Sequence, residues 1–113
     1  MRTKNASFQS SDLTLTTSDQ LVFFADVRNY RNKTLQIVLT PSHNKTAVIT
    51  VQAKCAYSGI GLNWVTLETI TMASGTDSAI KYYDEAYYLL KVLAKYTTGT
   101  GTLTCQAWVS CLE

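Results

Sequence analysis

Two stretches of the chain alternate between apolar and polar positions, as expected for strands that bury one face. The first stretch turns its apolar residues to one side at Ala47, Ile49, Val51, Ala53 and Cys55. The second repeats the pattern near the C-terminus at Leu103, Cys105, Ala107, Val109 and Cys111. Successive side chains of a strand point to opposite faces of a sheet. The pattern therefore predicts two strands that each direct small apolar side chains into a core.

Further short apolar runs, separated by turn-forming residues, cover most of the chain. All the runs together span residues 13–16, 21–27, 34–40, 47–55, 64–72, 78–82, 88–96 and 103–112. This spacing predicts an all-β fold: a single antiparallel β-sandwich, jelly-roll or Ig-like, with about seven to eight strands. We expect the domain to cover residues 12–113. Residues 1–11 are polar and aperiodic apart from Phe8, and we expect them to form a flexible N-terminal arm.

Turn sequences between these runs predict a meander of hairpins in the second half of the chain. Pro41 begins a Pro-Ser-His-Asn turn, and Gly99 and Gly101 lie in a Thr-Gly-Thr-Gly turn before the last run. The sequence SGIGLN at residues 58–63 predicts another hairpin connection. Trp64 follows it directly, and we expect Trp64 to close one end of the core rather than to form a ligand platform.

The segment YYDEAYYLLKVLAK at residues 82–95 is compatible with two structures. Apolar residues at 83, 86, 87, 90 and 94 have helical spacing, whereas the alternation from Tyr88 to Tyr96 has the period of a strand. The tyrosines and the Gly-Thr turn that follows favour a strand from about Tyr88. Residues 82–87 stay open as a possible helical turn.

Composition and charge narrow the function further. Charged residues make up 16% of the 113-residue chain, below the roughly 25% of an average protein. The basic residues are scattered, so no nucleic-acid partner is expected. No apolar run approaches the length of a membrane span, and the N-terminus lacks the apolar region of a signal peptide, so we expect a protein made and used in a cytosol. Three cysteines without a CxxC pair favour buried thiols over disulfides or a zinc site.

Candidate catalytic groups do not form a constellation. His43 lies in the turn that Pro41 begins, and Asp84 and Glu85 are adjacent, so on a strand they would face opposite ways. Asp77 could join Asp84 as a calcium ligand, but no calcium-loop spacing is present. We therefore expect no enzymatic activity, no catalytic, metal-binding or cofactor-binding residues, and no cofactor.

Aromatic and exposed apolar residues are the better candidates for binding. Trp108 would lie on a polar strand face, where a large aromatic residue is either covered by another element or contacts a partner. Ile60 and Leu62 would lie at the tip of a loop, where aliphatic side chains have no use within the chain. We expect an interface, if present, to include Phe8, Tyr57, Ile60, Leu62 and Trp108.

The order of three segments, AVITVQAKCAYSG, NWVTLETIT and YYDEAYYLLKVLAKYTTGTGTLT, resembles a pattern found in small β-sandwich proteins of tailed bacteriophage particles. The resemblance covers roughly residues 25–110 and consists of turns and core positions. It departs from that pattern at residues 60–62, where an acidic turn is usual, and at Ala86, where proline is usual. Such proteins are capsid decoration or cement proteins, head-fibre modules, or domains of tail and baseplate components. The resemblance implies a structural role without cofactor or catalysis.

These observations predict a non-enzymatic structural protein of a phage virion, assembled in the host cytoplasm. Our first expectation is an auxiliary capsid protein that binds the major capsid protein and its own copies. One alternative is a carbohydrate-binding module, with Tyr57, Trp64 or Trp108 stacked on a sugar ring. Another is a tail, connector or baseplate subunit.

Overall fold

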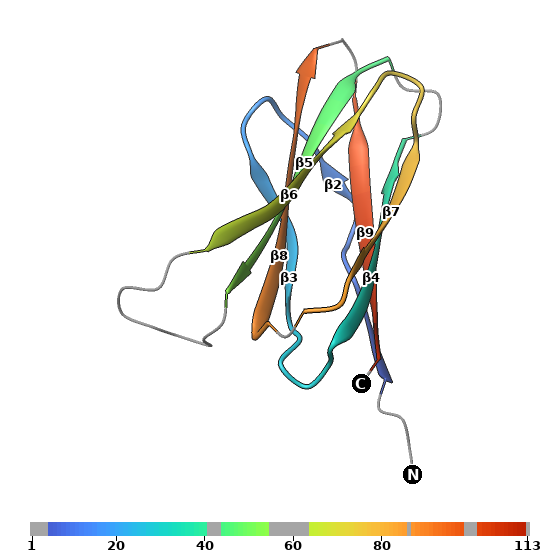
Figure 1. Cartoon of the computed structure of the whole chain (residues 1–113). Coiled ribbons are helices and arrows are strands. Elements are labelled where there is room, and N and C mark those ends of the chain that lie inside the picture. Colours follow the sequence, from blue (N-terminus) through green and yellow to red (C-terminus); the bar gives the residue numbers. More distant parts are fainter. Residues whose placement is uncertain (1–4, 41–43, 55–63, 86, 99–101, 113) are drawn as a thin grey trace.

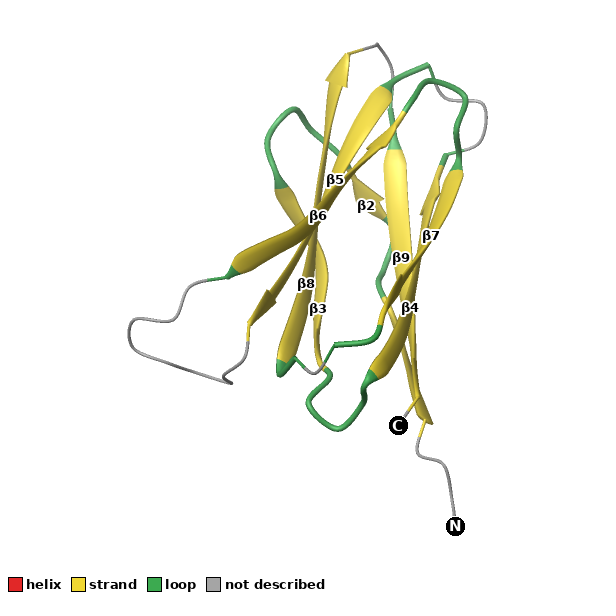
Figure 2. Cartoon of the chain, viewed as in Figure 1, coloured by secondary structure: helices red, strands yellow, loops and turns green. Residues whose placement is uncertain are grey.

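The computed structural model describes residues 5–40, 44–54, 64–85, 87–98 and 102–112. These residues form strands in two packed sheets and contain no helix (Figures 1 and 2). The strands are β1 (Asn5–Gln9), β2 (Leu13–Thr14), β3 (Gln20–Asp26), β4 (Asn32–Leu39), β5 (Thr46–Lys54), β6 (Val65–Met72), β7 (Ser78–Tyr83), β8 (Leu89–Thr98) and β9 (Thr104–Leu112). The expected all-β sandwich is confirmed. The strand alternative for residues 88–96 is also confirmed, because β8 begins at Leu89, one residue later than expected, and covers the rest of this range.

The strand order identifies the sandwich as a jelly roll. One sheet has the order β1-β9-β4-β7, with β2 also paired to β9, and the other has the order β3-β8-β5-β6. The antiparallel pairs are nested along the sequence: β5 with β6, β4 with β7, β3 with β8, and β1 and β2 with β9. A long antiparallel ribbon that is rolled over itself in this way is a jelly roll.

The expected meander of hairpins is wrong except at one place. β4 and β5 lie in different sheets, as do β8 and β9. The connections at residues 41–43 and 99–101, which lie outside the described residues, therefore join strands of opposite sheets. β5 and β6 do pair directly, so the connection containing SGIGLN joins neighbouring strands as predicted. Gly and Pro indicate where the chain turns, but they do not indicate to which sheet it returns.

The expected flexible arm is wrong for residues 5–9, which form β1 and pair with β9 from Asn5↔Leu112 to Gln9↔Trp108. Ala6 and Phe8 pack against the core. The pairing continues irregularly through Ser10, whose backbone N–H donates to the Ala107 carbonyl at 2.9 Å. Two apolar residues in a five-residue strand are too few to show a periodicity in the sequence.

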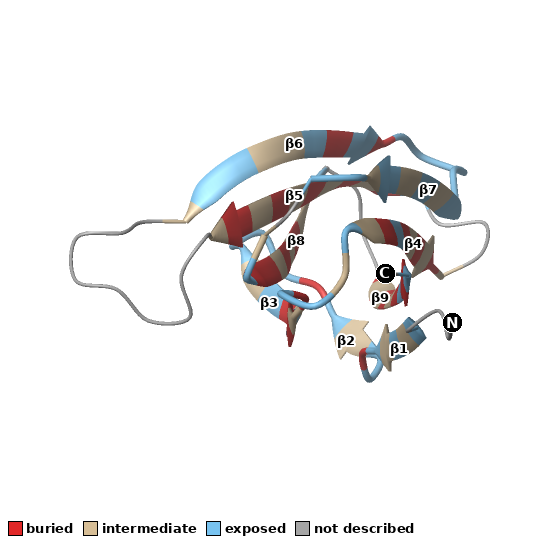
Figure 3. Ribbon diagram, turned by 60° about the horizontal axis from the view of Figure 1, so that its bottom comes forward, coloured by how far each residue is buried: buried red, intermediate tan, exposed pale blue. Residues whose placement is uncertain are grey.

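The core lies between the two sheets, where the inner faces of β4, β5, β8 and β9 are buried (Figure 3). The alternation predicted for β5 and β9 is confirmed at every described position. Cys105 and Cys111 are buried and free, as expected for small apolar side chains, whereas Cys55 lies outside the described residues.

A buried lysine ties two loops together at one end of the sandwich. Lys33 is fully buried on the inner side of β4. Its ammonium group donates to the Arg31 and Glu85 carbonyls at 2.6 Å each and to the Tyr30 carbonyl at 3.4 Å. Burial lowers the pKa of Lys33. The β3–β4 and β7–β8 connections therefore share one cation.

Candidate functional site

The outer face of the β1-β9-β4-β7 sheet carries no charged side chain within its described strands. Alternation and register direct the following residues outward: Asn5, Ser7 and Gln9 on β1; Gln106, Trp108, Ser110 and Leu112 on β9; Asn32, Thr34, Gln36 and Val38 on β4; and Ser78, Ile80 and Tyr82 on β7. We call this surface the neutral face. Charged residues ordinarily occupy such solvent-facing positions, so their absence distinguishes it.

Large apolar side chains stand exposed on the neutral face. Ile80 is 63% exposed, Tyr82 is 60% exposed and Leu112 is 47% exposed. The hydroxyl group of Tyr82 donates to Asn32 Oδ1 on β4 at 2.6 Å. Depletion of charge together with exposed aromatic and aliphatic residues is the composition of a protein interface centre.

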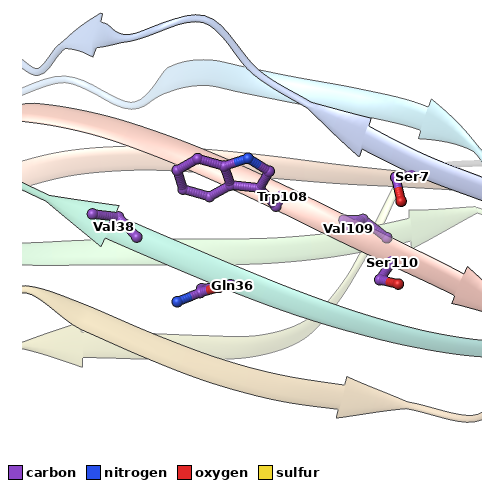
Figure 4. Close-up of a pocket in the computed structure, with 6 residues that line it drawn as sticks. All are labelled: Ser7, Gln36, Val38, Trp108, Val109 and Ser110. Carbon is purple, nitrogen blue, oxygen red and sulfur yellow. The ribbon is translucent and has the colours of Figure 1, made fainter.

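Trp108 lies in an open depression of the same face. The depression has a volume of about 310 Å³ and is lined by Ser7, Gln36, Val38, Trp108, Val109 and Ser110 (Figure 4). Trp108 is half-buried and pairs across the sheet with Gln9 on one side and Gln36 on the other. Two alternatives were open for Trp108: cover by another element, or contact with a partner. The described elements do not cover it, so its ring is accessible to a partner.

The outer face of the β3-β8-β5-β6 sheet is different, because it carries unpaired cations. We call it the lysine face. Lys54 on β5 and Lys91 and Lys95 on β8 point outward, and none of them forms an ion pair with a described residue. Residues 55–63, which follow Lys54, contain no acidic residue. Asp26 on β3 also points outward on this face, but it forms an ion pair with Arg28 at 2.9 Å. The lysine face therefore carries a net positive charge.

Trp64 lies on this lysine face and not in the core, which corrects the expectation. The Lys91 Nζ atom lies 4.3 Å from the centre of the Trp64 ring, and the Lys54 Nζ atom lies 5.5 Å from it. Burial lowers the pKa of Lys91, and the nearby Lys54 lowers it further. Two cations thus share one aromatic ring.

A bulge explains the position of Trp64. Between Glu68↔Val51 and Thr66↔Gln52 the register of β6 shifts by one residue, at Leu67. A one-residue shift moves every preceding side chain to the opposite face of the sheet. Trp64, which a regular alternation with Ile70 would direct inward, therefore points outward.

The expected interface residues divide into three groups. Trp108 lies on the neutral face, and its place at an interface stays a prediction. Phe8 is turned inward against the core, so its predicted place at an interface is corrected. Tyr57, Ile60 and Leu62 lie outside the described residues. The sequence did not single out Ile80 and Tyr82 as interface residues. The inner side of the strand Ser78–Tyr83 includes a lysine, so the sequence does not show which side of this strand faces the core.

Metal-ligating side chains do not cluster in the described part of the chain. It contains no group of three or more His, Cys, Asp or Glu residues that could hold a metal ion. It also contains no helix long and apolar enough to cross a membrane.

Comparison with known proteins identifies fold relatives but no family. No family model matches the sequence, and no curated protein matches it. Among solved structures, PirA superposes with a TM-score of 0.61 at 14% identity, covering 88% of this chain and 92% of PirA. The SPBc2 prophage-derived protein YomS superposes with a TM-score of 0.54 at 15% identity, covering 100% and 96% of the two chains.

A larger viral protein contains a similar sandwich. The chain in the VP2 subviral particle of infectious bursal disease virus superposes with a TM-score of 0.56 at 10% identity. The match covers 98% of this chain and 33% of the viral chain. At these identities the similarities show the fold alone.

Proposed function

We propose that this chain is a non-enzymatic structural protein of a bacteriophage virion. In this proposal it is an auxiliary capsid protein, of the decoration or cement type, that binds the major capsid protein and its own copies. The observation that carries the proposal is the neutral face, where Ile80, Tyr82 and Trp108 lie on a surface without charge. Such a surface favours protein contacts over solvent.

The fold relatives agree with this role without establishing it. A jelly roll of the same size occurs in a prophage-derived protein, and a similar sandwich occurs in a viral particle protein. Jelly rolls also serve other functions, so the argument depends on the surfaces of this chain.

The two faces suit two kinds of contact. The neutral face suits apolar packing against another copy, and the lysine face suits an acidic surface of the major capsid protein. Contacts of modest size, repeated over a lattice, give high avidity.

Copy number in purified particles tests this function. Quantitative mass spectrometry of virions that contain this protein should find it in numbers comparable to the major capsid protein. A few copies per particle would instead support a tail, connector or baseplate subunit. Absence from washed particles would reject the virion role.

The lysine face can be tested by charge reversal. Lys91→Glu should weaken binding of the purified protein to particles that lack it, and the binding should fall as salt is added. The matched control is Lys91→Arg, which keeps the charge and should bind as wild type does. Equal binding of both variants would show that the lysine face does not contribute to capsid attachment.

A carbohydrate-binding module is the second candidate, because of the depression at Trp108. There an aromatic ring lies beside the amide of Gln36 and the hydroxyl groups of Ser7 and Ser110, which are groups that can stack on a sugar and bond its hydroxyls. A glycan array should then show binding that Trp108→Ala abolishes and Trp64→Ala leaves intact. No glycan binding by the folded protein would remove this candidate.

A further inference from the structure

We propose that the neutral face packs against the neutral face of a second copy, about a two-fold axis that runs along β4. This inference takes up the self-association within the proposed function and assigns a surface and a symmetry to it. The inference rests on where the depression at Trp108 and the exposed side chains of Ile80 and Tyr82 lie on this face.

The neutral face is organised in rows that cross the strands. In one row, Trp108 of β9, Gln36 of β4 and Ile80 of β7 are register partners. In the next row, the partners are Ser110, Thr34 and Tyr82. β4 lies between β9 and β7, so each of these strands is about 4.8 Å from it, on opposite sides. The depression at Trp108 thus lies on the β9 side of β4, and the exposed Ile80 and Tyr82 lie on its β7 side. The exposed Leu112 lies apart from both, at the end of β9.

A two-fold axis along β4 brings these two sides together. The rotation turns the second copy over and exchanges the β9 and β7 sides, while each row stays at its own height. Ile80 of each copy then faces Trp108 of the other copy, and Tyr82 faces Ser110. Both contacts occur twice, as an isologous interface requires. The open depression of about 310 Å³ at Trp108 receives a protruding side chain from the partner.

Charge and area are consistent with a second copy as the occupant. A surface without charges can pack against its own copy without like-charge repulsion. Such repulsion opposes most contacts between two copies of a charged face. The strands β1, β2, β4, β7 and β9 are 5, 2, 8, 6 and 9 residues long. At about 3.4 Å per residue and about 4.8 Å between strands, they present roughly 500 Å² per copy in projection. Two copies then bury roughly 1,000 Å², the lower bound for a specific interface.

Sedimentation of the purified full chain gives the first test. Wild type should sediment as a dimer at micromolar concentration, and Ile80→Asp should sediment as a monomer with an unchanged circular dichroism spectrum. The matched control is Phe24→Asp, because Phe24 is 58% exposed on the opposite sheet. That variant should remain a dimer. A monomeric wild type, or an Ile80→Asp dimer, would overturn the proposal.

The position of the axis gives a second test that does not depend on a disruptive variant. Gln36 lies on β4, so the two copies of Gln36→Cys should lie opposite each other across the interface. Packed sheets are about 10 Å apart, so a short bismaleimide is a better probe than a disulfide. We expect a crosslinked dimer with Gln36→Cys. We expect none beyond the wild-type background, which reports on the native cysteines, with Thr50→Cys on the lysine face.

These outcomes are separable from the proposed function. If the wild-type protein is a monomer that still joins particles, the virion role stands and the dimer is rejected. If Ile80→Asp abolishes particle binding while wild type is monomeric, the neutral face contacts the major capsid protein instead. If the dimer forms but the protein is absent from particles, the dimer stands without the virion role.

Discussion

The side chain of Ser10 preserves the sheet where the N-terminal strand is interrupted. Between Gln9↔Trp108 and Leu13↔Cys105 the chain has one more residue than β9. The Ser10 Oγ atom accepts a hydrogen bond of 2.9 Å from the Ala107 N–H in this buried interval. Ser10→Ala leaves that N–H without this partner, so we expect the free energy of unfolding to fall by about 1–3 kcal/mol. Urea denaturation measures it. Ser18→Ala, at an exposed serine, should change it by less than about 0.5 kcal/mol.

For single residues, the sequence predicts the burial of apolar side chains well and the burial of polar side chains poorly. Cys105 and Cys111 could be placed inside because they continue an alternation that Leu103, Ala107 and Val109 also follow. Lys33 and Ser10 could not, because their burial depends on carbonyl and N–H groups contributed by distant parts of the chain. A single polar residue gives no sign of such a partner in the sequence.

Among the elements, Lys33 couples two connections that are far apart in sequence. Replacement by methionine keeps much of the side-chain volume but removes the donor from the Tyr30, Arg31 and Glu85 carbonyls. We expect Lys33→Met to lower the free energy of unfolding by about 2–4 kcal/mol, since bonds to a charged group are among the stronger ones. Hydrogen exchange should accelerate in the β3–β4 connection. Lys95→Met, on the lysine face, should change the unfolding free energy little, and an equal loss in both variants would contradict this role.

Strand positions follow from the sequence more readily than strand partners. Each predicted run from residue 13 onward coincides with an observed strand to within a few residues, because alternation is a local property. The nested pairing of the jelly roll joins residues as distant as Asn5 and Leu112, and no turn sequence specifies it. The bulge at Leu67 is similar, because one extra residue moves Trp64 from the predicted core to the surface.

For the whole molecule, the sequence leads to the prediction of an assembly protein but not to the positions of its surfaces. The low charge content was visible in the composition, whereas its concentration in a neutral face depends on which strands are neighbours. β1, β9, β4 and β7 come from both ends and the middle of the chain. The neutral face and the lysine face therefore form only when the fold brings strands from distant parts of the chain together.

The whole molecule should lose stability in alkaline solution. Burial raises the pKa of Cys105 from an ordinary value of 9.0 to about 12. Burial also raises the pKa of Cys111. The pKa of Tyr83 is raised mainly by burial and, to a smaller extent, by its hydrogen bond to Glu68. The folded state then keeps protons that the unfolded chain releases, so stability falls as the pH rises. For Cys105 this occurs between pH 9 and pH 12, with a slope of up to about 1.4 kcal/mol per pH unit.

Lys33 and Lys91 act in the opposite direction, since the lowered pKa of each makes stability rise with pH between its folded pKa and 10.5. Three groups with raised pKa values oppose these two lysines, so the net change above pH 9 should be a loss. Denaturant midpoints measured from pH 7 to pH 11 under reducing conditions should therefore decline. Cys105→Ala should be less stable than wild type at pH 7 because of the cavity it creates, but should decline less steeply above pH 9. Parallel declines in the two proteins would show that Cys105 ionisation does not control alkaline unfolding.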